Sequence, residues 1–333
     1  MNTLYIDNPL SSQSISIARM IKNHSNIKII GITDKKNKIK YFDELIKNSK
    51  FNFSLIDNRE KYYLPTTAKE TESCLKSDSV ILKNINLERN ALICYDKISF
   101  LKKALSINIP TPKTYFDINE ISEFPVFYKE KFEQGGGIRG IALNHSNIPI
   151  KHKENLIYQE YIKEKGTYGV AFIAKNGKLL ICHSHFEKDS FPKTGGSAIY
   201  IENFSHPNLI ENTRKIIKNL NYTGWGLAEF KYSKEIDNFI IMEINAKMWA
   251  SCEFTLINNP NFLSMLFGIN IKESKGIKSA IFLNRFFERG VIYVLKNIPL
   301  LFKADKIIIH PKLYISIIKS IIPNYIINRL KIN

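Results

Sequence analysis

Two alternating segments that carry acidic side chains constrain the fold of this chain most strongly. In residues 238–247 (NFIIMEINAK), Glu243 and Asn245 are two positions apart, so on a strand they point to one face. A short polar link joins this segment to the alternating run around Glu229, which predicts an antiparallel hairpin. Two carboxylates and a carboxamide on one face repel each other unless a cation lies between them, and these oxygen ligands suit Mg²⁺. A solvated acidic face is the alternative interpretation.

The N-terminal part alternates short apolar runs with amphipathic stretches. Residues 3–6 and 27–32 are expected strands, with a helix over 15–21 between them, and residues 51–56 and 79–82 are further strand candidates. This order predicts a doubly wound α/β unit with a parallel sheet. Its first turn, DNPLSSQS, lacks the glycine fingerprint of a dinucleotide site, so we expect none there.

From residue 96 onward the pattern changes to one helix followed by strands and hairpins. Apolar spacing predicts a helix over 96–105, which ends before Pro110. Alternating runs follow, and the Asn-Gly pair at 176–177 is typical of a tight hairpin turn. A helix over 207–220 interrupts the strands. These patterns predict mostly antiparallel α+β units after the parallel one.

A glycine-rich segment, QGGGIRG (134–140), lies between two strand candidates. Without Cβ atoms, such a loop brings backbone N–H groups close to phosphate oxygens, and Arg139 is a candidate anion contact. Lys129 lies on the apolar strand before the loop, and Lys97 opens the helix over 96–105. A buried lysine requires a partner for its ammonium group, although a solvated lysine is the alternative in this lysine-rich chain.

The order of these segments resembles the ATP-grasp superfamily over residues 1–275. MEINAKMWAS (242–251) resembles the MEINPRFWGS signature of the branch related to the large subunit of carbamoyl-phosphate synthetase. Four further segments resemble the same branch: YDKISFLKKALSINIPTPKTY, FPVFYKEKFEQGGGIRG, YQEYIKEKGTYGVAF and KTGGSAIY. The resemblance implies an N-terminal parallel-sheet unit followed by two α+β subdomains that enclose ATP.

The resemblance also implies roles for individual residues. It assigns Lys97 and Lys129 to the ATP phosphates, and Gly135, Gly136, Gly137 and Gly140 to a lid loop. It assigns Glu160, Tyr161 and Ile162 to the adenine, and Glu229, Glu243 and Asn245 to Mg²⁺ (or Mn²⁺). Lys247 and Arg139 are the expected catalytic residues. The resemblance implies that Lys247 stabilises the transferring γ-phosphoryl group or the acyl phosphate, and Arg139 is the candidate anion contact. The segments before the last helix suggest a substrate side that includes His183, Ser184, His185, Lys193, Gly195, Gly196 and Ser197. For the two histidines, a plain strand or loop role is the alternative.

Two departures from the family pattern concern the nucleotide. Thr167 stands where many members have an acidic residue for the ribose hydroxyls. Ala246 and Lys247 replace Pro-Arg, and lysine keeps the charge but loses the bidentate fork of arginine. We therefore expect weaker recognition of the ribose and a looser phosphate geometry than in those members.

The implied activity is the formation of a carbon–nitrogen bond. ATP phosphorylates a substrate carboxylate, and an amine, less often a thiol, then attacks the acyl phosphate. Two alternatives remain at this point: an ATP-binding relative without catalysis, and a nucleic-acid-binding protein. The formal net charge of +17 suggests the second, but no basic run with interleaved aromatic residues accompanies it, so nucleic acid is not the expected partner.

The C-terminal segment 281–333 is apolar and carries nine Lys and Arg against two acidic residues. Such a segment either lies in the interface of an anionic membrane or packs as a helix pair on the core or in a homodimer. The first alternative would suit a sugar- or lipid-linked substrate in surface-polysaccharide or secondary-metabolite biosynthesis.

The N-terminus lacks the features of a signal peptide, and the four cysteines form no CxxC pair, so we expect a cytoplasmic protein. If the first alternative for the C-terminal segment holds, the protein is also peripheral at the inner face of the membrane. The expected units are an N-terminal domain (1–95), a small lid subdomain (96–165), a C-terminal subdomain with the metal site (166–278) and an extension (279–333).

Overall fold

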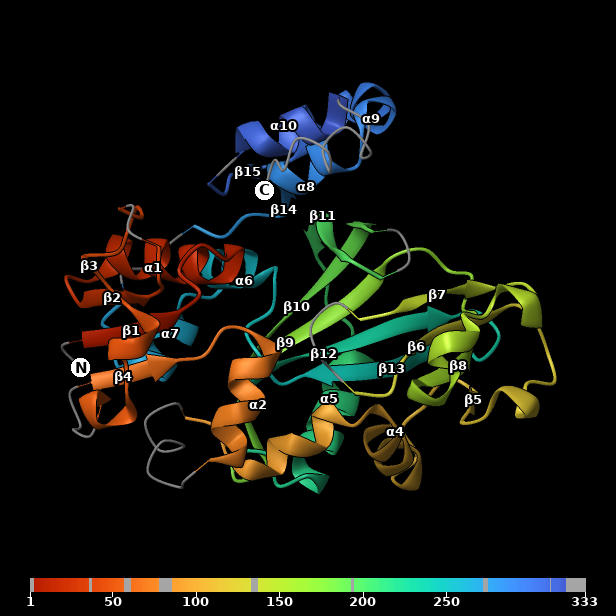
Figure 1. Cartoon of the computed structure of the whole chain (residues 1–333). Coiled ribbons are helices and arrows are strands. Elements are labelled where there is room, and N and C mark those ends of the chain that lie inside the picture. The colour runs from red at the N-terminus through yellow and green to blue at the C-terminus, as the bar shows by residue number, and fades with distance from the viewer. Residues whose placement is uncertain are drawn as a thin grey trace.

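A computed structural model describes residues 3–35, 38–56, 61–77, 86–132, 137–192, 195–271, 275–311 and 313–321. Three sheets organise these residues (Figure 1). A parallel sheet lies at the N-terminal end, a large sheet at the centre and a small sheet beside it. The fold is mixed α/β, as the sequence predicts.

The N-terminal sheet has four parallel strands in the order β3-β2-β1-β4. Apolar side chains from β1, β2 and the first helix form its core, including Leu4, Ile17 and Ile29. Ser11 begins this helix because its hydroxyl accepts a hydrogen bond from the backbone N–H of Ser14. The elements are β1 (Thr3–Asp7), α1 (Ser12–His24), β2 (Lys28–Ile32), β3 (Glu44–Ile46), β4 (Lys61–Leu64) and α2 (Ala68–Lys76).

One strand expected in this unit is wrong. Within residues 51–56 the chain forms a 3₁₀ helix (Phe53–Ile56), and the fourth strand is β4. The rings of Phe51 and Phe53 pack on Tyr63 of β4, with centroids 5.1 Å and 5.5 Å away. The alternation that indicated a strand therefore serves an aromatic cluster beside the sheet. The other candidate, 79–82, lies outside the described residues.

The small sheet is antiparallel, with the order β5-β8-β6-β7. It has its own apolar core, which includes Val126, Leu156 and Tyr158. Asp96 begins the preceding helix by accepting hydrogen bonds from the backbone N–H groups of Ile98 and Ser99. The elements are α4 (Lys97–Ser106), β5 (Thr114–Tyr115), β6 (Val126–Glu130), β7 (Arg139–Ala142) and β8 (Leu156–Glu160).

The large sheet has seven strands in the order β13-β12-β9-β10-β11-β14-β15. All neighbours are antiparallel except β14 and β15, and α5 packs on β9 and β10. The expected hairpin turn at 176–177 joins β9 to β10. The elements are β9 (Thr167–Lys175), β10 (Lys178–Phe191), β11 (Ser197–Asn203), α5 (Pro207–Asn219), β12 (Gly224–Ser233), β13 (Asn238–Asn245), α6 (Cys252–Asn258), α7 (Asn261–Phe267), β14 (Ser279–Phe282) and β15 (Lys306–Ile308).

The C-terminal segment is joined to this sheet. Its strands β14 and β15 form one edge, and three helices lie beyond them: α8 (Leu283–Glu288), α9 (Val291–Lys303) and α10 (Leu313–Ile321) (Figure 1). The other short 3₁₀ helices span Asn48–Lys50, Arg89–Tyr95, Ile118–Glu120, His145–Asn147 and Ile150–Asn155. Among the helices that the structure describes, none is long and apolar enough to cross a membrane. The domain boundaries drawn from the sequence stay a prediction.

Candidate functional site

The acidic side chains of the hairpin meet on the large sheet. Strands β12 and β13 pair so that Glu229 lies directly opposite Glu243. Asn245, two residues along, directs its Nδ2 toward Oε1 of Glu243 at 3.4 Å. The antiparallel hairpin predicted from the sequence is therefore present, and it brings the three oxygen-bearing side chains together.

Lys129 reaches this acidic group from the small sheet. Its Nζ lies 3.1 Å from Oε2 of Glu243 and donates to the carbonyl oxygen of Met242 at 3.5 Å. The lysine is almost fully buried, with 8% of its surface exposed. Its ammonium group therefore has the carboxylate partner that a buried lysine requires. This contact also ties β6 of one sheet to β13 of the other.

Glu229 lies in surroundings that disfavour its charge. Burial, followed by the charges of Glu243 and Glu187, raises its pKa to about 8, although Lys247 and Lys129 oppose the shift. A cation beside Glu229 would relieve this cost, because it replaces repulsion by attraction. In the part of the chain that the structure describes, no three His, Cys, Asp or Glu side chains gather as a metal site. Two carboxylates and a carboxamide nevertheless fit Mg²⁺, which keeps waters and phosphate oxygens as its other ligands.

Glu187 is a further acidic residue of this site that sequence analysis missed. It is buried on β10 and accepts a hydrogen bond from the hydroxyl of Ser251 at 3.2 Å. Its Oε1 lies 3.5 Å from Nε2 of His185. The signal was the spacing of two between His185 and Glu187, which places both on one face of a strand, as it does for Glu243 and Asn245.

A glycine separates the histidine from the acidic hairpin. Gly169 of β9 pairs with Glu229 on one side and with His185 on the other, so the three lie in one row across the sheet. A Cβ at Gly169 would collide with the imidazole ring of His185. His185 is fully buried, and neither ring nitrogen has a hydrogen-bond partner among the residues that the structure describes. Glycine here lets this histidine occupy the row.

The glycine-rich segment is described only in part. Gly135 and Gly136 lie outside the described residues, as does Lys193. Gly140 is on β7 opposite Tyr128, and a Cβ there would collide with the tyrosine hydroxyl. Gly137 lies two residues before this strand, near the carboxylate of Glu130.

Arg139 pairs with Lys129 across β6 and β7, so the strand pairing places both cations together. Arg139 also approaches the second glycine pair, since a Cβ at Gly195 would lie 3.7 Å from its Cδ. Gly196 follows, and Ser197 begins β11 opposite Phe191. Strand β7, which continues the expected lid loop, therefore lies next to the Gly195–Ser197 part of the expected substrate side.

The segment expected to hold adenine connects the two sheets. Glu160 ends β8, and its Oε1 accepts a hydrogen bond from the backbone N–H of Lys113 at 2.9 Å. The backbone N–H of Tyr161 donates to the carbonyl of Pro125 at 3.3 Å, and Ile162 follows in the link to β9. Thr167 begins β9 opposite Glu187. The link therefore has the position of a hinge, while one oxygen of Glu160 is already engaged within the chain.

The remaining predicted cations are Lys247 and Lys97. Lys247 is partly buried two residues beyond Asn245, and its positive charge opposes the rise in the pKa of Glu229. Lys97 is buried at the start of α4, where its backbone N–H donates to the carbonyl of Lys131 at 3.0 Å.

Arg285, from α8, is a cation near the site that the sequence did not reveal. Its guanidinium donates to the carbonyl oxygens of Ala198 and Ala250 at 2.8 Å and 3.0 Å. Burial lowers its pKa to about 10, against the favourable charge of Glu187. The C-terminal segment thereby contributes to the surroundings of the acidic face.

No protein-family model and no curated protein matches the chain. Solved structures share its fold. A biotin carboxylase from Campylobacter jejuni, solved with β,γ-ATP, is 16% identical with a TM-score of 0.62, over 83% of this chain and 73% of that one. An ATP-grasp superfamily protein from Archaeoglobus fulgidus is 13% identical with a TM-score of 0.61, over 84% and 91%. An L-amino acid ligase from Bacillus licheniformis is 9% identical with a TM-score of 0.58, over 78% and 70%.

These likenesses define the class of fold. The chain has the fold of ATP-grasp proteins, as its motifs predict. It spans 27% of the length of a matching pyruvate carboxylase chain from Rhizobium etli. The branch related to carbamoyl-phosphate synthetase stays a prediction.

Proposed function

We propose that this chain is an ATP-dependent ligase that joins a carboxylate to an amine. The γ-phosphoryl group of ATP passes to a carboxylate oxygen of the substrate, which gives an acyl phosphate and ADP. The amine nitrogen then attacks the carbonyl carbon, phosphate leaves with the electrons of the carbon–oxygen bond, and the nitrogen loses a proton. We expect the substrates to be sugar- or lipid-linked, in surface-polysaccharide or secondary-metabolite biosynthesis.

The observation that carries this proposal is the meeting of opposite charges between the two sheets. Glu243 and Glu229 face each other on the large sheet, and Lys129 enters from the small sheet to pair with Glu243. A triphosphate bound between the sheets would replace Glu243 as the ion-pair partner of the Lys129 ammonium group. That exchange suits a site that binds phosphate groups together with a cation.

The residues of the chain would act mainly by positioning and charge. Lys129, Lys97 and Arg139 would bind phosphate oxygens, and Lys247 would stabilise the charge that develops on the transferring group. Glu229, Glu243 and Asn245 would hold Mg²⁺, which supplies Lewis-acid stabilisation of the phosphoryl oxygens when bound. The glycine-rich segment would keep water from the acyl phosphate.

The test has two measurements, the first of nucleotide binding and the second of product. ADP with Mg²⁺ should stabilise the protein against thermal unfolding, by about 2.7 kcal/mol at a hundred times the dissociation constant. Incubation with ATP, Mg²⁺ and panels of carboxylates and amines should then yield a new amide by mass spectrometry.

Glu243→Ala should lose both the stabilisation and the product. Glu211→Ala, on an exposed face of α5, is the matched control and should retain them. Nucleotide binding without ADP release over the whole panel would favour a non-catalytic ATP-binding relative. No binding of ADP or ATP would overturn the proposal.

A further inference from the structure

Helix α9 (Val291–Lys303) is apolar on both of its faces, although it lies at the surface. One face packs on Phe286 through Tyr293, Val294, Leu300 and Leu301. No residue of the helix is fully buried. Surface helices normally turn a polar face outward, so the composition of the second face requires another explanation.

The second face exposes a continuous apolar stripe. Val291, Leu295, Ile298 and Phe302 follow one another at intervals of four, three and four residues, which places them along one side of the helix. Leu295 is 65% exposed and Phe302 is 85% exposed, and Ile292 beside them is 67% exposed. Single exposed apolar residues are common, but a stripe of this kind marks a contact surface.

The charges around the stripe are positive. Lys296 and Lys303 are exposed on the same helix, which has no acidic residue, and Lys306 follows on β15. The acidic residues closest to α9 in the sequence bond within the chain, and Asp189 of β10 lies close to Tyr293 on the packed face of the helix. Asp305 accepts hydrogen bonds from the backbone N–H groups of Lys278 and Ser279, and Glu288 accepts one from Ser316.

We propose that α9 is the docking surface for an anionic lipid bilayer. The apolar stripe would enter the boundary between headgroups and acyl chains, and the lysines would pair with anionic headgroups. A second copy of the chain is the less suitable partner, because a two-fold contact over this stripe would gather the lysines of both copies. Figure 1 places α9 at the end of the molecule opposite α4 and α5, so docking leaves those helices clear of the membrane.

Within the C-terminal segment 281–333, the proposed binding helix is therefore α9 and not α10. Helix α10 packs against α8, and Ile315 is buried, so this part follows the alternative of a helix packed on the core. Truncation is a poor test, because β14 and β15 belong to the large sheet. Substitutions on the exposed face of α9 leave that sheet intact.

The experiment is co-sedimentation of the full chain with vesicles. Wild-type protein should bind vesicles of phosphatidylcholine and phosphatidylglycerol mixed two to one, and should not bind phosphatidylcholine alone. Leu295→Asp/Phe302→Asp should lower binding by about a hundredfold, since two large apolar side chains no longer enter the bilayer. Lys296→Gln/Lys303→Gln should lower it by about twentyfold at low salt, since each lysine near the surface contributes about fivefold.

Matched controls carry the same changes elsewhere. Leu105→Asp/Leu143→Asp alters two leucines that are 63% and 68% exposed, and Lys175→Gln/Lys178→Gln alters two exposed lysines beside a hairpin turn. Both should bind like the wild type, and all variants should unfold in urea like it. Absence of binding to anionic vesicles, or equal binding by Leu295→Asp/Phe302→Asp, would overturn the proposal. So would light scattering that finds a dimer which this variant dissociates, without vesicle binding by the wild type.

Discussion

Two buried carboxylates of this chain have opposite surroundings. Burial, together with the charges of neighbouring carboxylates, raises the pKa of Glu229 on the acidic face to about 8. Glu253, on α6, is buried as well, which opposes its ionisation. However, hydrogen bonds from His310 and Ser16 and the charge of Arg19 lower its pKa below the usual value.

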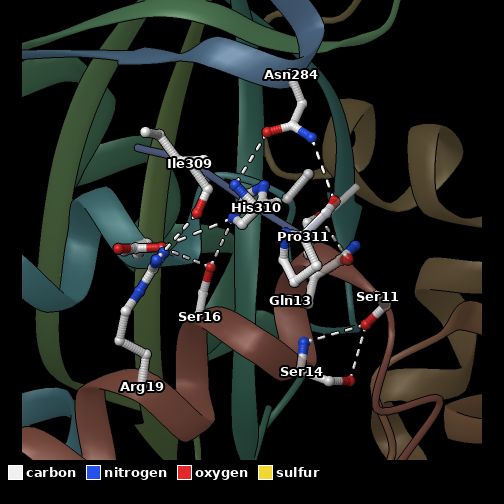
Figure 2. A network of polar contacts seen from close by, with 12 residues as sticks. Ser11, Gln13, Ser14, Ser16, Arg19, Asn284, Ile309, His310 and Pro311 are labelled. Atoms are coloured by element: carbon white, nitrogen blue, oxygen red, sulfur yellow. Dashed lines mark hydrogen bonds and ion pairs between the residues drawn. The ribbon is translucent and has the colours of Figure 1, made fainter. Parts of the chain in front are cut away.

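The contacts of Glu253 form a polar junction between distant parts of the chain. Figure 2 shows Ser16, Arg19, Asn284 and His310 of this junction. We define this junction as Ser16 and Arg19 of α1, Glu253 of α6, and Asn284 and His310 of the C-terminal segment. Arg19 pairs with Glu253 and donates to the carbonyl of Ile309 at 3.0 Å. Asn284 Oδ1 accepts from the backbone N–H of His310 at 2.9 Å.

Comparing Glu253 with Glu229 distinguishes a buried carboxylate that stabilises the fold from one that is suited to binding a ligand. A buried carboxylate that the chain itself neutralises stabilises the fold, and its removal should weaken it. A buried carboxylate left beside other carboxylates costs stability until a ligand arrives, which is a frequent property of binding sites. The two residues should therefore respond in opposite ways to substitution and to pH.

The largest effect is expected from Glu253→Gln. Glutamine keeps the shape but leaves the guanidinium of Arg19 without its charged partner, so the free energy of unfolding should fall by about 3 kcal/mol. Urea unfolding at pH 7 measures this change. The control is Glu211→Gln, whose ion pair with Arg214 is about half exposed and should contribute less than about 0.5 kcal/mol. If both variants lost the same free energy of unfolding, the buried ion pair of Glu253 would contribute no more to stability than the exposed pair of Glu211.

A smaller effect of opposite sign is expected from Glu229→Gln. The pKa of Glu229 is raised from 4.5 to about 8 in the folded protein, so its contribution to stability is complete below pH 4.5 and is lost as the pH rises through 8. Glutamine does not ionise. Without divalent cations, the variant should match the wild type at pH 5 and exceed its free energy of unfolding by about 1–3 kcal/mol at pH 9.

The test is to measure the free energy of unfolding against pH for the wild type and for Glu229→Gln. For Glu253 the sign is reversed, because its lowered pKa stabilises the fold above pH 4.5 and that contribution disappears as the pH falls through the folded-state pKa. A Glu229→Gln variant that is less stable than the wild type at pH 9 would mean that the chain already neutralises this carboxylate.

The two carboxylates also differ in how far the sequence predicts their roles. Glu229, Glu243 and Asn245 lie on one hairpin, so local alternation is enough to bring them together. The polar junction joins residues from three separate regions of the chain, and local patterns carry no information on such contacts. The same reason explains why Arg285 was missed near the acidic face, whereas the alternation that places Glu187 on one face with His185 was present in the sequence and was overlooked.

Other differences arise where tertiary packing overrides local pattern. The alternating aromatic residues near Phe53 form a 3₁₀ helix because their rings pack on Tyr63. The parallel sheet, the hairpins and the helices α4 and α5 follow from apolar spacing, turn residues and caps, and they were predicted. The exposed stripe of α9 could not be read from composition, since only the fold decides which apolar face of a helix is left uncovered.

The smallest effect concerns Ser16, whose hydroxyl donates to Oε2 of Glu253 at 2.8 Å inside the polar junction. Ser16→Ala should lower the free energy of unfolding by about 1–2 kcal/mol at pH 7, because the acceptor is charged and buried. The loss should shrink at an acidic pH low enough to protonate Glu253, whose pKa is lowered, since a neutral carboxyl accepts this bond less strongly. Ser106→Ala, which removes an exposed hydrogen bond to the carbonyl of Lys103, should change stability by less than about 0.5 kcal/mol at either pH. A loss for Ser16→Ala that is the same at both pH values would show that the hydroxyl contributes by packing and not by stabilising the charge of Glu253.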